Sequence, residues 1–484
     1  MPRLTDLLGS PHPQDRDIAG LTADSRAVKP GFLFAALAGT KADGRAFVPA
    51  ALAAGAVAVL AAPGSGLELP AGVTLIEDSN PRRRFALMAA AFHGLQPQTM
   101  VAVTGTNGKT STALFHRQIM KSLGLRSAAI GTLGIIADDW PNPGGLTTPD
   151  PVALHDTLAR LARHGVSHAC MEASSHGLDQ YRLDGVRLQA AAFTNLTRDH
   201  LDYHQDMASY AAAKQRLFTE VLPHGAVAVI NTDADGADTL TAACGARGLR
   251  VLTYGKAGGD IHLIASTPTP LGQDLRLQVM GMPAAIHLRL AGLFQAYNAM
   301  AALGLALATG ADRAEALDAL EHLEGVPGRL QKVAERANGA AIYVDYAHTP
   351  DALETVLTAL RPHVVRRLVA VFGCGGDRDP GKRPQMGAIA CRLADAMIVT
   401  DDNPRSEDPA AIRTAILAAC CGAIEIADRR EAIRTAAQGL QRGDLLVIAG
   451  KGHETGQIIG GAILPFDDAE EARAAVLLAD GGLS

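Results

Sequence analysis

The stretch Val101-Ala-Val-Thr-Gly-Thr-Asn-Gly-Lys-Thr-Ser-Thr112 decides the fold of this 484-residue chain. Its apolar start predicts a buried strand, and the residues from Gly105 to Ser111 form a glycine-rich turn that opens a helix. Such a turn aims backbone N–H groups at phosphate oxygens, Lys109 adds a positive charge, and the Thr110 hydroxyl can bind Mg²⁺. A plain strand-to-helix turn does not explain Gly-Lys-Thr directly after a run of apolar strand formers. We therefore predict a phosphate-binding loop, although Val103 stands where the general P-loop pattern has its first glycine.

The composition indicates a multidomain α/β protein. Lys+Arg number 44 against 50 Asp+Glu, a net charge of −6, and the chain is 48% hydrophobic but only 4% aromatic. The apolar residues are mainly Ala, Leu, Val and Ile, a composition that suits α/β layers. The high hydrophobic content excludes intrinsic disorder. The length predicts two or three domains. The mild acidity, without a long Lys/Arg run, argues against nucleic acid as the main partner.

The cysteines and the apolar runs indicate the compartment. The 6 cysteines show no Cys-x-x-Cys spacing, so we expect reduced, mostly buried thiols. Residues 1–20 lack the basic and then apolar pattern of a signal peptide. The longest apolar run, residues 50–62, holds thirteen residues and is too short to span a bilayer. We expect a cytoplasmic protein with no membrane insertion.

The pattern of strands and helices divides the chain into three expected domains. Residues 1–95 mix short strands with Ala-rich helices and predict a small α/β domain. Residues 96–328 alternate strands and helices around a parallel sheet, with shorter, antiparallel-type strands between 249 and 290. Residues 329–484 alternate again and predict a Rossmann-like third domain.

Two neighbouring strand ends of the second domain carry ligand-type side chains. Glu172 closes one expected strand, and His200 follows the next. Because ligands bind at the carboxyl ends of strands in an open parallel sheet, we favour both as Mg²⁺ ligands near the phosphate loop over a solvated turn residue or a hydrogen-bonded polar histidine. Lys214, two turns into a helix that begins at Asp206, is by itself typical of a surface lysine.

Polar loops also follow the strands of the third domain. Asp345 and His348 end one strand, and the loop after the next holds glycines with the cations Arg378, Lys382 and Arg383. The segments Asp402-Asn-Pro-Arg405 and Gly450-Lys-Gly-His-Glu454 follow two further strands. Any one of these loops is a credible surface turn, but together they predict a site that recognises anions, either phosphate or carboxylate.

With these residues in view, the chain resembles the Mur ligases, the ATP-dependent amide ligases of peptidoglycan precursor synthesis, over essentially its whole length. The segments that carry the resemblance are Gly105-Thr-Asn-Gly-Lys-Thr110, Glu172-Ala-Ser-Ser-His-Gly177, Asn195-Leu-Thr-Arg-Asp-His-Leu-Asp-Tyr-His204, Asp345-Tyr-Ala-His-Thr-Pro-Asp351 and Gly450-Lys-Gly-His-Glu454. Within the family, Asp402-Asn-Pro-Arg405 is similar to the signature of enzymes that add meso-diaminopimelate to UDP-N-acetylmuramoyl-L-alanyl-D-glutamate. Lysine-adding relatives carry a different loop there.

The resemblance implies an N-terminal domain for the UDP end of the substrate, a central ATPase domain and a C-terminal domain for the incoming amino acid. It implies a site for ATP formed by Gly105, Thr106, Asn107, Gly108, Lys109, Thr110, Ser111, Asn298 and Asp345. It places the uridine nucleotide at Ser25, Thr40, Lys41 and Ala42. It places the muramoyl dipeptide at Thr147, Thr148, Ser174, Gln180 and Arg182.

The resemblance also implies the catalytic centre and the amino-acid site. The implied catalytic residues are Lys109, Glu172, His200 and Lys214. The implied Mg²⁺ ligands are Thr110, Glu172, His200 and Lys214, the last as a carbamylated N6-carboxylysine. The implied diaminopimelate contacts are Arg378, Asp402, Asn403, Pro404, Arg405, Gly450 and Glu454. The chain departs from many relatives at two positions, with Gln295 in place of Asn and Gly456 in place of Tyr.

The implied reaction joins three small molecules, the UDP-muramoyl dipeptide, ATP and meso-diaminopimelate, on a protein that we expect to be a monomer. The D-glutamate carboxylate becomes an acyl phosphate, which the diaminopimelate amine then attacks. One alternative is a relative of the same architecture, such as a folylpolyglutamate synthase or another Mur ligase. A different class of alternative is a regulatory nucleotide-binding protein that keeps the phosphate loop without ligase chemistry.

Overall fold

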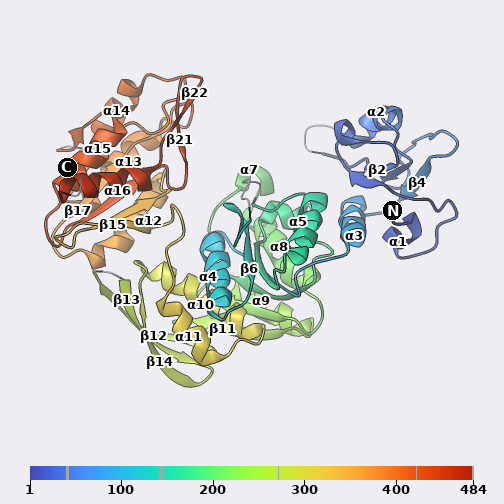
Figure 1. Cartoon of the computed structure of the whole chain (residues 1–484), viewed down its shortest axis with the longest axis horizontal. Coiled ribbons are helices and arrows are strands. Elements are labelled where there is room, and N and C mark those ends of the chain that lie inside the picture. The colour runs from blue at the N-terminus through green and yellow to red at the C-terminus, as the bar shows by residue number, and fades with distance from the viewer. Residues whose placement is uncertain (40–42, 141–146, 271, 421, 482–484) are drawn as a thin grey trace. The chain divides into compact units, whose positions relative to one another are not determined.

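The computed structural model describes residues 1–39, 43–140, 147–270, 272–420 and 422–481, without the side chains of residues 201 and 202. The chain forms two compact units. The first comprises Met1–Ile261 with Met300–Ala316, and the second comprises His262–Ala299 with the chain from Leu317 onward. Each unit contains parallel sheet covered by helices, which confirms the α/β prediction (Figure 1). The expected domain boundaries near residues 95 and 328 stay a prediction.

A four-stranded parallel sheet of order β1-β2-β3-β4 organises the N-terminal part. Helix α2 packs on one apolar face, and α1 and α3 pack on the other. Asn80 caps α3 by accepting the Arg83 N–H at 3.0 Å, and Pro81 follows at the first helical position. The elements are α1 (Leu4–Leu8), β1 (Gly20–Thr22), η1 (Ser25–Ala27), β2 (Phe32–Ala35), η2 (Gly44–Phe47), α2 (Val48–Ala53), β3 (Ala58–Ala61), β4 (Thr74–Glu77) and α3 (Pro81–His93).

The central sheet has the order β11-β10-β9-β5-β8-β6-β7 within the first unit. Its strands are parallel except β7, which pairs antiparallel with β6. Its elements are β5 (Thr99–Thr104), α4 (Lys109–Ser122), β6 (Ser127–Gly131), β7 (Gly134–Ala137), α5 (Pro151–Arg163), β8 (His168–Glu172), α6 (Ser175–Asp179), β9 (Leu188–Phe193), α7 (Leu201–His204), α8 (Met207–Arg216), η3 (Leu217–Val221), β10 (Val227–Asn231), α9 (Ala237–Ala246) and β11 (Arg250–Gly255).

Helices cover both faces of this central sheet. Met100 and Ala102 of β5 point into the core formed with α5, α6 and α9, so the intervening Val101 and Val103 point to the opposite face. Helix α4 packs against β6 and β8. Strand β5 therefore lies between β8 and β9 with all its residues buried, and its carboxyl end leads directly into Gly105.

The second unit holds an antiparallel set of strands and a six-stranded sheet. The antiparallel strands, predicted between 249 and 290, are β12 (Ile261–Thr269), β13 (Gly272–Val279) and β14 (Met282–Leu288). Two helices follow them in the chain, α10 (Leu293–Ala308) and α11 (Arg313–Glu321), and residues 300–316 of this stretch belong to the first unit. The six-stranded sheet has the order β15-β16-β20-β17-β18-β19 and is parallel except at β15.

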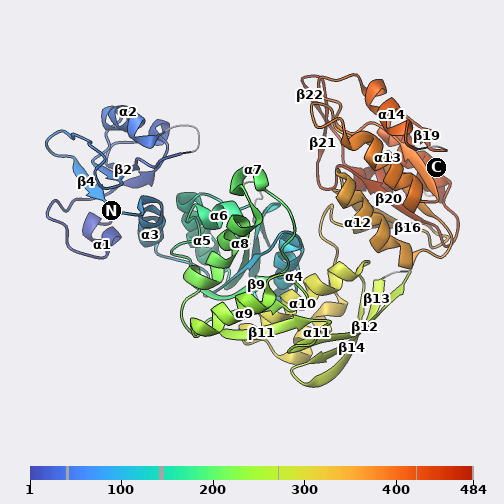
Figure 2. The same ribbon diagram turned by 180° about the vertical axis from the view of Figure 1, so that it is seen from behind.

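Helices cover both faces of the six-stranded sheet as well. Residues of α12, α13 and α14 fill one core, in front of the sheet in Figure 2, and residues of α15 and α16 fill the other. The elements are β15 (Gln331–Glu335), β16 (Ala341–Asp345), α12 (Pro350–Leu360), η4 (Arg361–His363), β17 (Leu368–Phe372), α13 (Lys382–Leu393), β18 (Ala396–Val399), α14 (Pro409–Leu417), β19 (Ile424–Glu425), α15 (Arg429–Gln438), β20 (Leu445–Ala449) and α16 (Asp468–Ala479). A separate hairpin consists of β21 (Gly456–Ile459) and β22 (Ala462–Pro465).

The described cysteines agree with the expectation of reduced, mostly buried thiols. None of them forms a disulfide, and Cys391 alone among them is exposed. The described buried thiols are Cys170, Cys244, Cys374 and Cys420. Cys421 lies outside the described residues.

His116 on α4 is buried in the central core with a consequence for acid stability. Its side chain is 1% exposed, and neither ring nitrogen has a hydrogen-bond partner in the described part of the chain. Burial lowers the pKa of His116 to about 3, and the nearby His168 adds to this effect. A histidine in the unfolded chain has a pKa of about 6.5. As the pH falls below that value, the unfolded state therefore binds a proton that the folded state excludes.

We predict that replacing His116 by leucine weakens the acid sensitivity of the fold. In the wild type this residue alone should lower the free energy of unfolding by about 2 kcal/mol between pH 7 and pH 5, and His116→Leu should remove that loss. Urea denaturation at both pH values measures the difference. His322→Leu, at an exposed histidine after α11, is the control and should behave as the wild type. Equal losses in His116→Leu and the wild type would contradict the prediction.

Candidate active site

The phosphate-binding loop joins β5 to the N-terminus of α4. Gly108 caps α4 with a left-handed φ of +86°. Gly105 has φ +144°, and a Cβ there would lie 1.9 Å from the Thr194 Oγ1, so only glycine fits. The Lys109 Nζ donates to the carbonyl oxygens of Gly105 at 2.9 Å and Thr106 at 2.8 Å. The loop thus places a lysine and a helix N-terminus together, as predicted for phosphate binding.

The segment after β9 holds this loop in shape. The Thr106 N–H donates to the Asn195 carbonyl oxygen at 2.9 Å, and the Asn107 N–H donates to the Asn195 Oδ1 at 2.9 Å. The Thr197 N–H donates to the Thr106 Oγ1 at 2.9 Å. Asn195 and Thr197 belong to the segment quoted for the resemblance, but they were not among the predicted site residues. Their role follows only from the pairing of β5 with β9.

Glu172 and Thr110 line one small cavity of about 10 Å³ beside β6. The Glu172 Oε1 accepts the Thr132 N–H at 2.8 Å, and a Cβ on Gly131 would lie 2.0 Å from the same oxygen. A hydroxyl and a carboxylate are the hard oxygen donors that Mg²⁺ prefers, so the chemistry of these two side chains fits the ion, whereas the other residues of the cavity wall are apolar or glycine. Among the described residues no group of three or more His, Cys, Asp or Glu side chains forms a metal cluster.

Lys214 is buried, whereas its position on the helix alone suggested a surface lysine. Only 2% of it is exposed, because α8 turns this face toward the phosphate-binding loop. The Lys214 Nζ donates to the Gly105 carbonyl oxygen at 2.8 Å and lies 4.4 Å from the centre of the Tyr210 ring. Burial, together with the positive charge of Lys109, lowers the pKa of Lys214 to about 6.

His200 lies at the start of α7 with a left-handed φ of +53°. Its ring centre is 6.2 Å from that of Tyr210, and its Nε2 is 3.5 Å from the Asp199 Oδ2. Tyr210 therefore contacts both Lys214 and His200, and its hydroxyl is 3.2 Å from the Thr106 Oγ1. Sequence reasoning missed Tyr210, whose only signal was its place one helical turn before Lys214 on the same face.

The five residues expected at the muramoyl dipeptide form one polar network with Glu172. The Thr148 Oγ1 donates to the Glu172 carbonyl oxygen at 2.9 Å and is 3.0 Å from the Ser174 Oγ. Arg182 donates to the Thr148 carbonyl oxygen and to the Gln180 Oε1, both at 2.7 Å. Thr147 joins through the Thr132 hydroxyl at 3.0 Å. The structure thus brings all five predicted residues together.

The residues expected at the uridine nucleotide lie in the N-terminal part. Ser25 begins η1, which is capped by Asp24 through its bond to the Arg26 N–H at 3.0 Å. Thr40, Lys41 and Ala42 lie outside the described residues.

In the second unit, the two further residues expected at ATP lie beside one short segment. The Asn298 Nδ2 donates to the Gln295 Oε1 at 3.0 Å, and the Gln295 Nε2 donates to the Arg329 carbonyl oxygen at 3.3 Å. Asp345 accepts the Leu330 N–H at 2.6 Å and the Ala347 N–H at 2.8 Å. Burial raises the pKa of Asp345 to about 6, although these hydrogen bonds oppose the rise.

Residues 402–405, which we term the recognition loop, lie against the glycine-rich loop after β17. A Cβ on Gly376 would lie 2.0 Å from the Pro404 carbonyl oxygen, so glycine permits the close approach. The Arg405 Nη1 donates to the Gly376 carbonyl oxygen at 2.7 Å. The other guanidinium nitrogens of Arg405 donate no hydrogen bond within the described chain. Arg378 is exposed in the glycine-rich loop.

The side chains of Asp402 and Asn403 point into the domain. Both are buried, and burial raises the pKa of Asp402 above its usual range. The Asn403 Nδ2 donates to the Glu454 Oε2 at 2.8 Å, which joins the recognition loop to the segment after β20. Gly450 begins that segment with φ +125°. The predicted amino-acid residues therefore gather at the carboxyl ends of β17, β18 and β20.

This fold and these loops define a class of protein, the multidomain α/β proteins that bind phosphate at a strand-to-helix loop. Family models match three successive stretches of the chain. They are the Mur ligase family, catalytic domain at residues 17–93, the Mur ligase middle domain at 103–306 and the Mur ligase, glutamate ligase domain at 328–452. The chain belongs to the Mur ligase family.

Relatives match over nearly the whole length. A protein of Caulobacter vibrioides named UDP-N-acetylmuramoyl-L-alanyl-D-glutamate–2,6-diaminopimelate ligase is 55% identical over 97% of both chains. One of Bradyrhizobium diazoefficiens with the same name is 53% identical over 98% of this chain and 99% of its own. A solved structure of a ligase of that name is 38% identical, with a TM-score of 0.76 over 95% of this chain and 94% of its own.

A more distant solved structure shares the fold alone. The folylpolyglutamate synthase of Mycobacterium tuberculosis is 21% identical, with a TM-score of 0.61 over 82% of this chain and 95% of its own. As for membranes, no helix in the described ranges is long and apolar enough to cross one.

Proposed function

We propose that this chain is an ATP-dependent ligase that adds meso-diaminopimelate to UDP-N-acetylmuramoyl-L-alanyl-D-glutamate. The observation that carries the proposal is Arg405, held with unused guanidinium donors at the carboxyl end of a Rossmann-like sheet. Relatives of that name at 53–55% identity support the substrate assignment. The distant folylpolyglutamate synthase supports only the architecture.

The reaction begins with activation of a carboxylate, which does not react with an amine in water. A carboxylate oxygen of D-glutamate attacks the γ-phosphorus of ATP, the bond to the β,γ-bridging oxygen breaks, and ADP leaves. The N–H groups at the N-terminus of α4 and the Lys109 ammonium stabilise the phosphate charge during this transfer. Ser111, on the first turn of α4, belongs to the same loop, and Asn298 and Asp345 are the further residues proposed to bind the nucleotide.

The second step forms the amide. The diaminopimelate amine attacks the acyl carbon, a tetrahedral intermediate forms, and phosphate leaves as the amine loses its proton. Water competes with the amine for the acyl phosphate, so the site has to exclude water during both steps. The network from Thr147 to Arg182 binds the muramoyl dipeptide and fixes the carboxylate that reacts.

Mg²⁺ fits the oxygen donors at the phosphate-binding loop. Thr110 and Glu172, which line one cavity, would hold the ion together with His200 and a carbamylated Lys214. When bound, Mg²⁺ neutralises phosphate oxygens and favours phosphoryl transfer. Glu172 is held for this task by two hydrogen bonds from Thr132, at 2.8 and 3.2 Å.

Carbamylation gives Lys214 a chemical role that an ammonium cannot have. Lys214 is buried beside Lys109, and among the described residues no carboxylate lies within ion-pair distance of it. With its pKa lowered to about 6, the amine is mostly uncharged at neutral pH and can attack the carbon of CO₂. An N–C bond forms and the proton leaves to solvent, so a cation becomes a carboxylate ligand.

Diaminopimelate differs from lysine by a second carboxylate, and Arg405 suits that group. A guanidinium binds a carboxylate through paired N–H bonds, and lysine would leave it unpaired at a cost of about 1–3 kcal/mol or more. Glu454 can bind the ammonium, and Arg378 supplies a second cation for carboxylate. Asn403 donates a hydrogen bond to Glu454 and so sets the position of the Glu454 carboxylate.

We also propose where the protein acts and in what oligomeric state. ATP and a nucleotide-linked sugar are molecules of the cytoplasm, so the protein acts there. Each of the roles above is filled by residues of one chain, so we also propose a monomer, which sedimentation analysis tests directly.

An amino-acid panel tests the function. The protein is incubated with ATP, the UDP-muramoyl dipeptide and either meso-diaminopimelate, L-lysine or L-glutamate, and both phosphate release and product mass are recorded. We expect a tripeptide product with meso-diaminopimelate alone. Product with another amino acid would favour a different ligase of this architecture. Nucleotide binding without any amide product would favour a regulatory protein.

We predict that Arg405→Ala weakens diaminopimelate binding selectively. Loss of the paired bonds to its second carboxylate should raise the KM for diaminopimelate by about 10- to 100-fold while the KM for ATP stays within about twofold. Steady-state kinetics with each substrate varied in turn measures both constants. Equal increases in the two KM values would refute the role given to Arg405.

We predict that Lys214 carries a carbamate. Wild-type protein equilibrated with ¹³C-bicarbonate should show a carbamate carbon resonance that Lys214→Ala lacks, and the variant should lose ligase activity by at least about 100-fold. Lys121→Ala, at an exposed lysine on α4, is the control and should keep both signals. A fully active wild-type enzyme without the resonance would show that the lysine acts unmodified.

A further inference from the structure

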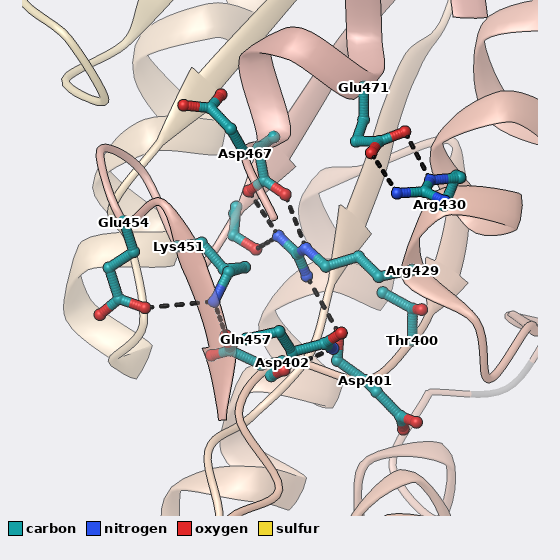
Figure 3. Close-up of polar contacts among 12 residues, drawn as sticks. Thr400, Asp401, Asp402, Arg429, Arg430, Lys451, Glu454, Gln457, Asp467 and Glu471 are labelled. Atoms are coloured by element: carbon teal, nitrogen blue, oxygen red, sulfur yellow. Dashed lines mark hydrogen bonds and ion pairs between the residues drawn. The ribbon is translucent and has the colours of Figure 1, made fainter. Parts of the chain in front are cut away.

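Lys451 is a fully buried lysine between the recognition loop and Glu454. It is 0% exposed, yet it lies in the segment Gly450–Glu454 that the resemblance linked to the incoming amino acid. Its Nζ donates to the Asn403 Oδ1 at 2.9 Å. It also donates to the Glu454 Oε2 at 3.2 Å and lies 3.9 Å from the Asp402 Oδ1 (Figure 3). A side chain without exposed surface cannot touch a substrate, so Lys451 acts through the residues it bonds.

A buried ion pair and two carboxyl groups lie around Lys451. Arg429 is paired with Asp468 through two bonds of 2.7 Å, and both side chains are 0% exposed. Lys451 then faces two carboxyl groups, those of Asp402 and Glu454. Glu454 is the exposed member, with 34% of its side chain accessible, and its Oε1 accepts no hydrogen bond within the described chain. The Glu454 carboxylate therefore presents an unused oxygen to solvent, where an ammonium can bind.

The β21–β22 hairpin also holds the recognition loop in place. The Gln457 Nε2 donates to the Asp402 carbonyl oxygen at 2.7 Å, and the Ile458 N–H donates to the Asn403 Oδ1 at 2.9 Å. The Arg405 N–H donates to the Ile458 carbonyl oxygen at 3.1 Å, and the Gly460 N–H donates to the Arg405 carbonyl oxygen at 2.7 Å. These bonds hold Arg405 at φ +52°, a left-handed conformation that non-glycine residues seldom adopt.

We propose that Lys451 and Gln457 are positioning residues for the diamino acid substrate, on the basis of the proposed function. Lys451 holds Asn403 and Glu454 together and directs the Glu454 Oε1 toward the ammonium. Gln457 holds the backbone of the recognition loop from which Arg405 reaches the second carboxylate. Neither touches the reacting atoms, so their loss acts on binding of the amino acid and not on transfer of phosphate.

Lys451→Met tests this proposal. Methionine is unbranched and apolar and of similar length, so it fills the buried space but leaves Asp402 and Glu454 without their cation. We expect the KM for meso-diaminopimelate to rise by about 10- to 100-fold, while the KM for ATP and for the UDP-muramoyl dipeptide, and kcat at saturation, change by less than about threefold.

Arg367→Met is the matched control. Arg367 precedes β17 at the amino ends of the parallel strands, whereas the recognition loop lies at their carboxyl ends. Arg367 pairs at 2.7 Å with Asp444, which is itself buried. This variant also removes a cation from a buried carboxylate, although Arg366 still pairs with Asp444 at 2.9 Å, so it should lower Tm but leave the KM for diaminopimelate unchanged. A rise in that KM in Arg367→Met as large as in Lys451→Met would show a general effect of stability and overturn the proposal.

Gln457→Met covers the case in which Lys451→Met does not fold. It removes the one bond to the Asp402 carbonyl oxygen, and a raised KM for diaminopimelate with unchanged KM for ATP supports the proposal, whereas an unchanged value overturns it. The assay of the wild-type enzyme distinguishes failure of the proposed function from failure of the positioning roles. Without an amide product from wild-type enzyme and diaminopimelate, the proposed function itself fails. With that product but unchanged KM in the variants, only the positioning roles fail.

Discussion

Both faces of a buried parallel strand pack against apolar residues, so reactive side chains are excluded along its length. This constraint determines where the chemistry of the protein can lie. Every residue of β5, β16, β17 and β20 is buried, with backbone groups paired to neighbouring strands. Polar side chains can gather only where such strands end. The first unit accordingly places Lys109 and Glu172 at strand ends, and the second unit places Asp345, Arg405 and Glu454 at theirs.

This constraint explains which parts of the site could be predicted. Apolar runs indicate the strands, and Asp345, expected at the end of a strand, is the last residue of β16 (Ala341–Asp345). Once the strands are known, the residues that follow them must share an edge of the sheet. The network from Thr147 to Arg182 is harder to foresee, because it joins the strand-end segment after β8 to residues 147 and 148, which lie before α5.

The remaining features depend on tertiary packing, which local pattern does not encode. Lys214 lies on a helix of mixed composition, and only the docking of α8 onto the phosphate-binding loop buries it. The β21–β22 hairpin was not predicted, because residues 456–465 have two glycines at the turn but no alternation of polar and apolar residues. The two buried lysines also show how environment decides chemistry: Lys451 is surrounded by carboxylates, whereas Lys214 faces a carbonyl oxygen, a ring and another lysine.

The bonds between the recognition loop and the hairpin restrict how this protein can be redesigned. Residues 402–405 and 457–460 are separated by some fifty positions, yet Asp402, Asn403 and Arg405 each depend on a donor or acceptor from the second stretch. A grafted loop without the Asn403 amide would keep the bonds of the loop backbone but leave the Ile458 N–H and the Lys451 ammonium without this acceptor. A change of amino-acid preference, in directed or in natural evolution, has to alter both stretches together. We therefore expect residues 402–405 and 457–460 to covary among homologous chains.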